Sequence, residues 1–295
     1  MRSRLFLLVL LVLPRLAGSQ RPDPSRAFDY AAAQCPSCAE WNAPQKPLRL
    51  FGNTWYVGTK GLSALLITSP QGHVLIDGGI PASAPSIIAS IKALGFRVED
   101  VRLIVNSHDH YDHAGGIAEL QEASGAAVAA SPASAPVLRA GKSGPDDPQF
   151  GLLLPFAPVR EVRIVSDGET LHAGGVDVTA HFTPGHTPGG TTWTWRSCEG
   201  PVCRDMVYAD SQTPVSADGF FYTRSTTYPN AIADFERGFK VLDQLSCDIL
   251  ITPHPSASKL WERVETQTLV DANACKRYAT NARGALARRI ATERQ

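Results

Sequence analysis

The sequence predicts a layered α/β protein, and two observations point to this fold class. Apolar runs typical of strands alternate along the chain with segments whose apolar residues recur at helical spacing. In addition, a unit of strand, helix and strand occurs twice, with an aspartate ending its first strand and a histidine following its second. The first unit begins with the strand VLIDGG and ends with the strand LIVNSHDH. The second unit begins with MVYADS and ends with DILITPHP. Two such halves packed face to face would bring both histidine-bearing strand ends to one edge.

The first half of the chain supplies five predicted strands and three predicted helices. Residues 20–47 contain five prolines and predict an irregular N-terminal arm. Short apolar runs then predict strands at 48–58, 63–68, 73–79, 101–105 and 126–130. A Pro-Gln-Gly turn joins the second and third of these runs, as in a hairpin. Apolar residues at helical spacing predict helices at 84–94, 114–124 and 131–140.

The second half begins with a long loop rich in proline and glycine over 141–160. Apolar runs predict strands near 161–165, 176–182, 190–196, 205–209 and 248–252. Helical spacing predicts one helix over 231–245 and a C-terminal helix from about residue 269.

The composition excludes a disordered chain, and the charge balance argues against a nucleic-acid-binding protein. The 295 residues are 43% hydrophobic and 19% charged, which is too apolar for a disordered chain. The 28 basic residues balance the 28 acidic residues, whereas a nucleic-acid-binding protein normally carries a basic excess.

Residues 1–19 have the features of a secretory signal peptide. Two arginines precede an apolar run at 5–13, and small residues at 17–19 suit cleavage after Ser19. The apolar run is too short to cross a bilayer as a mature helix, which disfavours the alternative of an uncleaved membrane anchor. Cleavage would leave 25 basic and 28 acidic residues, a mildly acidic exported protein.

The segment 108–113 (HDHYDH) is the densest cluster of potential metal ligands. It follows an apolar strand directly and precedes a Gly-Gly turn, so alternate side chains point in opposing directions and can serve two neighbouring metals. Its potential ligands are His108, His110, Asp112 and His113. Imidazole and carboxylate groups suit Zn²⁺, and three protein ligands with one open position are typical of a catalytic site. A solvated polar loop is the alternative, but this spacing is more specific than a single histidine.

Two later histidines lie in similar contexts. His186 occurs in a rigid TPGHTPG turn after a strand, and His254 follows the strand-like run DILIT. With the 108–113 segment they give five histidines and one aspartate, enough for two three-ligand sites. His73, His172 and His181 lie within or beside strands and are expected to be ordinary surface or core residues.

The six cysteines suggest disulfides, because an exported protein meets an oxidising compartment. Cys198 and Cys203 flank a short turn and could pair, and Cys247 and Cys275 would then tie the last strand to the C-terminal helix. The remaining pair, CPSC at 35–38, has the spacing of a redox motif. It lies in a polar segment without the βαβ context of such motifs, so we expect a structural role.

The HxHxDH segment, the later Gly-His and the final His among βα repeats resemble the metallo-β-lactamase fold. This resemblance implies an αββα sandwich over a single domain, 48–295, with a dinuclear zinc site at the edge of the two central sheets. The motif does not specify a substrate, because lactonases, glyoxalase II-type thioesterases, nucleases and β-lactamases share the fold.

Longer stretches resemble the third subgroup of the class B β-lactamases, which are exported enzymes of Gram-negative bacteria. These stretches are GNTWYVGTKGLSALLITSPQGHVLIDGG, DPQFG, TPGHTPGGTTWTWRSCE, VYADSQT and LSCDILITPHPS. The resemblance implies one zinc held by His108, His110 and His186, and a second held by Asp112, His113 and His254. It also implies the disulfides Cys198–Cys203 and Cys247–Cys275.

The same resemblance assigns residues around the metals. Ser211 stands where other subgroups use a cysteine ligand, and Ser211 and Thr213 would help hold a water or the substrate carboxylate. Gln149 would lie on a loop over the metals. Two positions depart from the pattern. Lys60 replaces a cysteine that bridges the N-terminal arm in some relatives, and Asp210 resembles an aspartate that bridges both metals in lactonase and glyoxalase II-like relatives.

The resemblance thus implies a monomeric periplasmic β-lactamase with two Zn²⁺ ions, which confers antibiotic resistance. A metal-bound hydroxide oriented by Asp112 would open the β-lactam amide of penicillins, cephalosporins or carbapenems. An exported lactonase or thioesterase is the alternative, and ligation of the metals by Asp210 would favour it. A structural zinc protein would need closed four-ligand sites, and a nuclease would bind nucleic acid in a salt-dependent way. A serine β-lactamase would instead need a nucleophilic serine in an SxxK motif.

Overall fold

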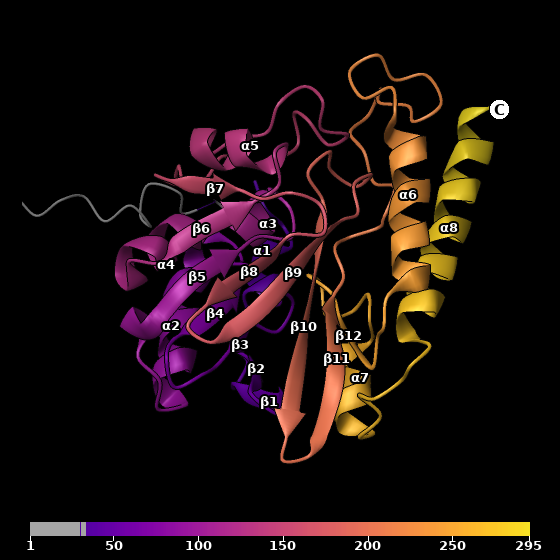
Figure 1. Ribbon diagram of the computed structural model, residues 1–295. Coiled ribbons are helices and arrows are strands. Elements are labelled where there is room, and N and C mark those ends of the chain that lie inside the picture. Colours follow the sequence, from indigo (N-terminus) through magenta and orange to yellow (C-terminus); the bar gives the residue numbers. More distant parts are fainter. Residues whose placement is uncertain (1–29, 31–33) are drawn as a thin grey trace, which may run out of the picture.

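The computed structural model describes Tyr30 and residues 34–295 (Figure 1). The predicted signal peptide and the first part of the N-terminal arm lie outside the described residues. No helix in the described part of the chain has both the length and the apolar character needed to cross a membrane.

Two β-sheets form the centre of the molecule. The first sheet has seven strands in sequence order: β1 (Leu48–Phe51), β2 (Thr54–Tyr56), β3 (Leu65–Ile67), β4 (His73–Ile76), β5 (Val101–Val105), β6 (Ala127–Ala130) and β7 (Val162–Ile164). Its strands are antiparallel from β1 to β4 and parallel from β4 to β7. The second sheet has five strands: β8 (Thr170–Ala173), β9 (Val176–Phe182), β10 (Thr191–Glu199), β11 (Val202–Tyr208) and β12 (Ile249–Ile251). Only the β11–β12 pair in this sheet is parallel.

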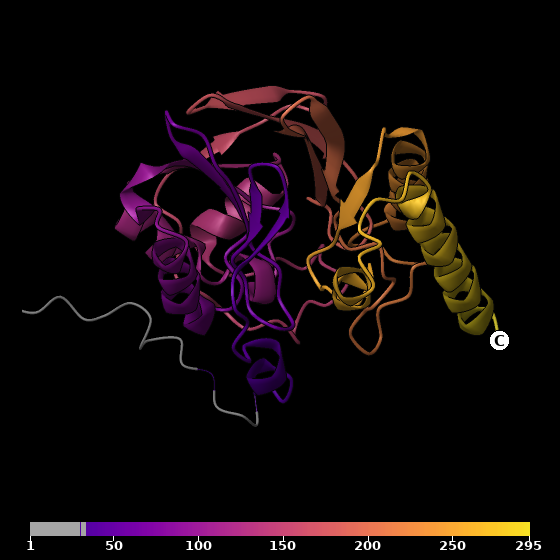
Figure 2. The same ribbon diagram turned by 90° about the horizontal axis from the view of Figure 1, so that it is seen from below.

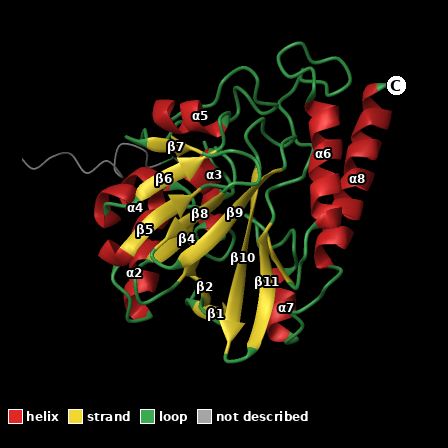
Figure 3. Ribbon diagram, in the orientation of Figure 1, coloured by secondary structure: helices red, strands yellow, loops and turns green. Residues whose placement is uncertain are grey.

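Helices cover the outer faces of both sheets (Figures 2 and 3). The helices that follow strands of the first sheet are α2 (Ala84–Ala93), α3 (Tyr111–Ala114), α4 (Ile117–Ser124) and α5 (Ser134–Ala140). Those in the C-terminal part are α6 (Ala231–Gln244), α7 (Leu260–Glu265) and α8 (Ala274–Glu293). The order of layers is therefore helix, sheet, sheet, helix, which confirms the predicted αββα sandwich.

β3 and β4, in the middle of the first sheet, are buried along their whole length, which explains their nearly continuous apolar sequences. In β4, Val74 and Ile76 belong to the core between the sheets, whereas Leu75 packs under the helices. The second sheet contributes Trp193 to the core between the sheets. The side chain of Trp193 is fully buried, and its Nε1–H donates to the carbonyl oxygen of Asn106 at 2.9 Å.

The repeated unit seen in the sequence is present in space. β4 and β5 are parallel neighbours in one sheet, as are β11 and β12 in the other. Asp77 follows β4 and Asp210 lies two residues beyond β11, so each half carries a buried aspartate at an equivalent strand end. The histidine-bearing ends of β5 and β12 meet at one edge, as the repeat predicts.

The structure differs from the sequence expectations at several short elements. Residues 48–58 form two strands rather than one, because Gly52 adopts a left-handed backbone (φ 51°) and turns the chain. β8 and α7 were not predicted, since both are short and carry polar side chains among few apolar ones. The arm, expected to be irregular, contains one helical turn, α1 (Cys38–Trp41).

The structure pairs all six cysteines. The disulfides are Cys35–Cys38, Cys198–Cys203 and Cys247–Cys275. The first lies in the arm, the second joins β10 to β11, and the third ties α8 to the segment before β12.

Candidate metal centre

Asp77 fixes the backbone from which the 108–113 segment starts. Its carboxylate accepts hydrogen bonds from the Ser107 backbone N–H (2.7 Å), the Ser107 hydroxyl (2.7 Å), the Asn106 amide (3.1 Å) and the Tyr208 hydroxyl (2.8 Å). Asp77 is fully buried and has a left-handed backbone with φ 61°, a conformation that a non-glycine residue adopts at an energetic cost. One carboxylate thus joins the end of β5 to the second sheet beneath the candidate site.

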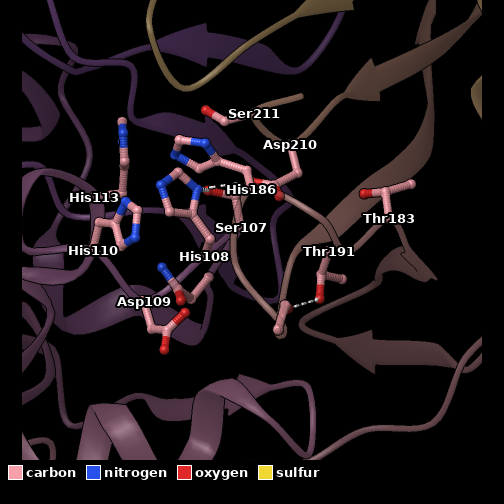
Figure 4. Close-up of polar contacts among 12 residues, drawn as sticks. Ser107, His108, Asp109, His110, His113, Thr183, His186, Thr191, Asp210 and Ser211 are labelled. Atoms are coloured by element: carbon pink, nitrogen blue, oxygen red, sulfur yellow. Dashed lines mark hydrogen bonds and ion pairs between the residues drawn. The ribbon is translucent and has the colours of Figure 1, made fainter. Parts of the chain in front are cut away.

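His108, His110 and His186 converge to form a first donor set. Their ligand atoms all lie within 4.8 Å of one another, and their ring centroids are 4.8–5.0 Å apart. Figure 4 shows these rings gathered with that of His113 in one group. His108 and His110 come from the loop after β5, whereas His186 comes from the rigid turn between β9 and β10.

Each histidine of this set uses its outer nitrogen for a hydrogen bond. With the ring proton on that nitrogen, His108 Nδ1 donates to Asp210 (2.7 Å) and His110 Nε2 to Asp147 (2.9 Å). His186 Nδ1 donates to the carbonyl oxygen of Thr213 (2.8 Å). This pattern leaves His108 Nε2, His110 Nδ1 and His186 Nε2 to face a common point. Metal-ligating histidines are typically held in this way by an outer carboxylate or carbonyl group.

The donor set fits a metal ion. His108 Nε2 is buried and has no hydrogen-bond partner, which is costly unless something binds there. Burial and the neighbouring His110 lower the pKa of His186 to about 3, and burial with His113 lowers the pKa of His108 well below its usual value. Both rings are therefore neutral and can offer a lone pair. Burial acts in the same direction on His110, but Asp147 outweighs it and raises the pKa, so a metal competes with a proton there.

A second donor set lies beside the first. Asp112 Oδ2 is 3.2 Å from His113 Nε2 and 3.2 Å from His254 Nε2, and these two nitrogens are 3.3 Å apart. The ligand atoms of His108, Asp112 and His113 also lie within 4.8 Å of one another, so the two sets adjoin at His108. Although burial raises the pKa of Asp112, His113 and His254 hold it well below its usual value, and the carboxylate is ionised.

Asp210 approaches the first set from outside. Its Oδ1 accepts from His108 Nδ1, and Figure 4 shows Asp210 at the edge of the group of imidazoles. Its Oδ2 is buried without a partner, and Gly190 leaves room for it, since a Cβ there would lie 2.3 Å from that oxygen. In this structure the carboxylate of Asp210 therefore orients a histidine rather than lying between the two donor sets.

The family model for the metallo-β-lactamase superfamily matches residues 57–260, more than half of the chain. The chain belongs to this superfamily. Solved metallo-β-lactamases resemble it over nearly their whole length. Rm3 metallo-β-lactamase is 56% identical, with a TM-score of 0.87 and coverage of 88% of this chain and 99% of that one. MEM-A1, a subclass B3 metallo-β-lactamase from a soil metagenome library, is 50% identical, with a TM-score of 0.84 and coverage of 86% and 98%.

Curated relatives match shorter segments of the metallo-β-lactamase domain. The N-acyl homoserine lactonase AttM of Azorhizobium caulinodans is 32% identical over 80 residues, 20% of this chain and 30% of AttM. The chain spans about half or less of the length of such curated relatives. Rm3 metallo-β-lactamase and MEM-A1 both match most of the chain, and MEM-A1 is of subclass B3, as the resemblance in the sequence predicts.

The residues expected to contact substrate each lie near the candidate metal centre, but their surroundings differ. Figure 4 places Ser211 beside the group of imidazoles. Thr213 lies against the outer side of His186, with its hydroxyl 3.2 Å and its carbonyl oxygen 2.8 Å from Nδ1. The backbone N–H of Gln149 donates to Asp147 at 2.7 Å, which ties its loop to the partner of His110.

Sequence reasoning missed Asp147 and Thr213 as partners of the histidines. Asp147 lies in the Pro/Gly-rich loop 141–160, 37 residues from His110, and nothing in its spacing links the two. Three histidines that were set aside have ordinary environments. His73 packs on Phe96, His172 contacts Asp177 at the surface, and His181 contacts Thr194.

Replacing Asp147 by alanine is expected to weaken metal binding at the first donor set about 10- to 100-fold, because His110 loses the group that orients it. Competition between the protein and a chromophoric chelator for zinc measures this change. Asp146→Ala is the matched control, since Asp146 is the adjacent aspartate and is exposed. Equal zinc affinities for the two variants would show that the Asp147–His110 contact does not contribute.

Proposed function

We propose that the protein is a zinc-dependent β-lactamase that hydrolyses the amide bond of the β-lactam ring and so confers antibiotic resistance. The observation that carries this proposal is the presence of two adjoining donor sets of imidazole and carboxylate groups. The 56% identity to Rm3 metallo-β-lactamase over nearly its full length supports the substrate class. Penicillins, cephalosporins and carbapenems are the proposed substrates.

In this proposal His108, His110 and His186 hold one Zn²⁺, and Asp112, His113 and His254 hold a second. When bound, zinc supplies Lewis acidity and makes hydroxide available from water at neutral pH. Neutral imidazoles and an ionised Asp112 are the protonation states that such binding needs. The buried, unpartnered Nε2 of His108 supports the assignment of that atom as a ligand.

The chain's own residues then orient the reacting groups. The ionised carboxylate of Asp112 can hold the attacking water and accept its proton, because His113 and His254 fix one of its oxygens. The Ser211 hydroxyl can donate to the substrate carboxylate, together with the hydroxyl of Thr213. Gln149 lies on the loop that Asp147 ties to His110, so this loop can contact the substrate while remaining attached to the site.

Hydrolysis of a carbapenem by the purified mature protein tests the proposal directly. We expect the β-lactam absorbance to fall rapidly, the loss to stop when a chelator removes the metal, and activity to return when zinc is added. The effect of the chelator on stability gives a second measurement. Apoprotein should unfold at a lower temperature, because a ligand at 1,000 times its dissociation constant contributes about 4 kcal/mol. A folded, zinc-loaded protein without turnover of any β-lactam would contradict the proposal.

An exported lactonase or thioesterase is the second candidate function, and the partial match to the lactonase AttM is the observation that favours it. In relatives of that kind an aspartate resembling Asp210 lies between the metals, whereas Asp210 here contacts the outer nitrogen of His108. Hydrolysis of an N-acyl homoserine lactone, measured in the same preparation, compares the two activities.

We also propose that the enzyme is a periplasmic monomer released by cleavage after Ser19. The features of residues 1–19 support export. The pairing of all six cysteines in disulfides supports an oxidising compartment.

A further inference from the structure

His254 is the most exposed of the proposed metal ligands. Its side chain is 29% exposed, whereas that of Asp112 is 8% exposed and the remaining proposed ligands are all buried. Its outer nitrogen, Nδ1, lies 3.3 Å from the carbonyl oxygen of Gly61, a longer contact than those made by the histidines of the first set. The surrounding protein therefore holds His254 less tightly by burial and by hydrogen bonding than it holds the other ligands.

The carbonyl that His254 contacts belongs to a turn attached to the N-terminal arm. The Gly61 N–H donates to the Trp41 carbonyl oxygen at 3.0 Å, and the Thr59 hydroxyl donates to the same oxygen at 2.7 Å. The Lys60 N–H donates to the carbonyl oxygen of Ala43 at 2.9 Å. A Cβ at Gly61 would lie 2.7 Å from Trp41 Cα, so the arm and the turn meet without space for another atom.

The same tryptophan also contacts the imidazole. The Trp41 and His254 ring centroids are 5.2 Å apart with the planes tilted by 52°. One residue of the arm thus touches His254 directly through its ring and indirectly through the Gly61 carbonyl. These two contacts limit the rotamers of a ligand that solvent would otherwise leave free, and restricting rotamers before binding lowers the entropic cost of binding.

The arm also contacts the segment that carries the other ligands of the second set. Cys35 Sγ lies 3.5 Å from the hydroxyl of Tyr111, which directly precedes Asp112, and the Tyr30 ring packs edge-on against Tyr111 at 5.4 Å. The Cys35–Cys38 disulfide restrains the chain segment that joins these contacts to Trp41. The arm therefore spans the two chain segments that supply Asp112, His113 and His254.

We propose that Trp41 is a positioning residue for His254 and that residues 35–43 of the N-terminal arm set the affinity of the second metal separately from that of the first. This inference rests on the proposed function in taking His254 as a metal ligand. The inference also assigns a structural role to the CPSC segment. Its disulfide holds the arm in place beside the candidate metal centre and does not exchange electrons.

Stepwise zinc binding, measured by competition with a chromophoric chelator, tests the inference without using activity. Trp41→Ala is expected to raise the dissociation constant of the second zinc ion by about tenfold or more. The dissociation constant of the first zinc ion should stay within about twofold of the wild-type value. Trp41→Phe should restore most of the second affinity, because a ring again packs on His254. Gly61→Ala should act like Trp41→Ala, because its methyl group pushes the arm from the turn.

Trp55→Ala is the matched control, since Trp55 is another partly buried tryptophan and packs on Phe96. It should change neither constant, even if it lowers thermal stability as much as Trp41→Ala does. The inference would be overturned if both dissociation constants were unchanged in Trp41→Ala and Gly61→Ala. It would also be overturned if these variants lost zinc affinity equally at both sites. Failure of the proposed function would give a different result. The wild-type protein would then bind fewer than two zinc ions, or the His254→Ala variant would bind two zinc ions as tightly as the wild type does.

Discussion

Replacing Asp112 by asparagine is expected to lower kcat for carbapenem hydrolysis by about a thousandfold, the range over which a positioned acid–base group acts. The amide has nearly the shape of the carboxylate but can neither accept the proton of the attacking water nor contribute a negative charge to the second donor set. Asp112 Oδ2 lies 3.2 Å from both His113 and His254, so the substitution also changes the partner of two proposed ligands.

Asp109→Asn is the matched control for this prediction. Asp109 is also buried in the 108–113 segment, but its carboxylate accepts from the Ser134 hydroxyl at 3.2 Å and belongs to neither donor set. Steady-state kinetics, zinc content and thermal unfolding of both variants separate loss of chemistry from loss of fold. If a folded Asp112→Asn enzyme with two zinc ions kept a tenth of the wild-type kcat, Asp112 would have no part in the proton transfer.

Replacing Trp193 by alanine is expected to lower the free energy of unfolding by about 3–5 kcal/mol. The indole is fully buried between the two sheets, so its removal leaves a cavity that the rigid strands on both sides cannot fill. The substitution also leaves the carbonyl oxygen of Asn106 without its donor, two residues before His108. Guanidinium denaturation of the zinc-loaded protein measures the change.

Trp193→Phe provides the comparison, because it keeps an aromatic ring in the core and removes only the indole N–H and part of the volume. We expect it to cost less than half as much as the alanine substitution. A loss below about 1 kcal/mol in Trp193→Ala would mean that the two sheets close over the cavity and that the core is softer than its packing indicates.

The layers of the fold could be predicted because apolar spacing reports burial. The runs at 101–105 and 176–182 coincide with β5 and β9, since each strand carries its own periodic pattern. β8 escaped prediction because only one of its four residues is fully buried, so no apolar run marks it. The helical turn in the arm was missed for a related reason, since the four residues of α1 include none that is fully buried.

The site could be predicted only where its residues lie close together in sequence or in a recognisable turn. His108, His110, Asp112 and His113 form such a cluster, and the glycines and prolines around His186 mark a constrained turn. The groups that orient these histidines are far away in sequence. Asp210 is 102 residues from His108 and Asp147 is 37 residues from His110, and only the folded chain joins them.

The convergence of ligands from both sheets has a mechanical consequence. The loop after β5 and the helix α3 that follows it supply four of the proposed ligands, while the loops after β9 and β12 supply His186 and His254. A metal ion shared between them would cross-link the two halves of the sandwich at one edge, in the way that a disulfide joins two strands. Removal of zinc would break this cross-link. Amide hydrogen exchange should then become faster at this edge, while the core around Trp193 stays protected.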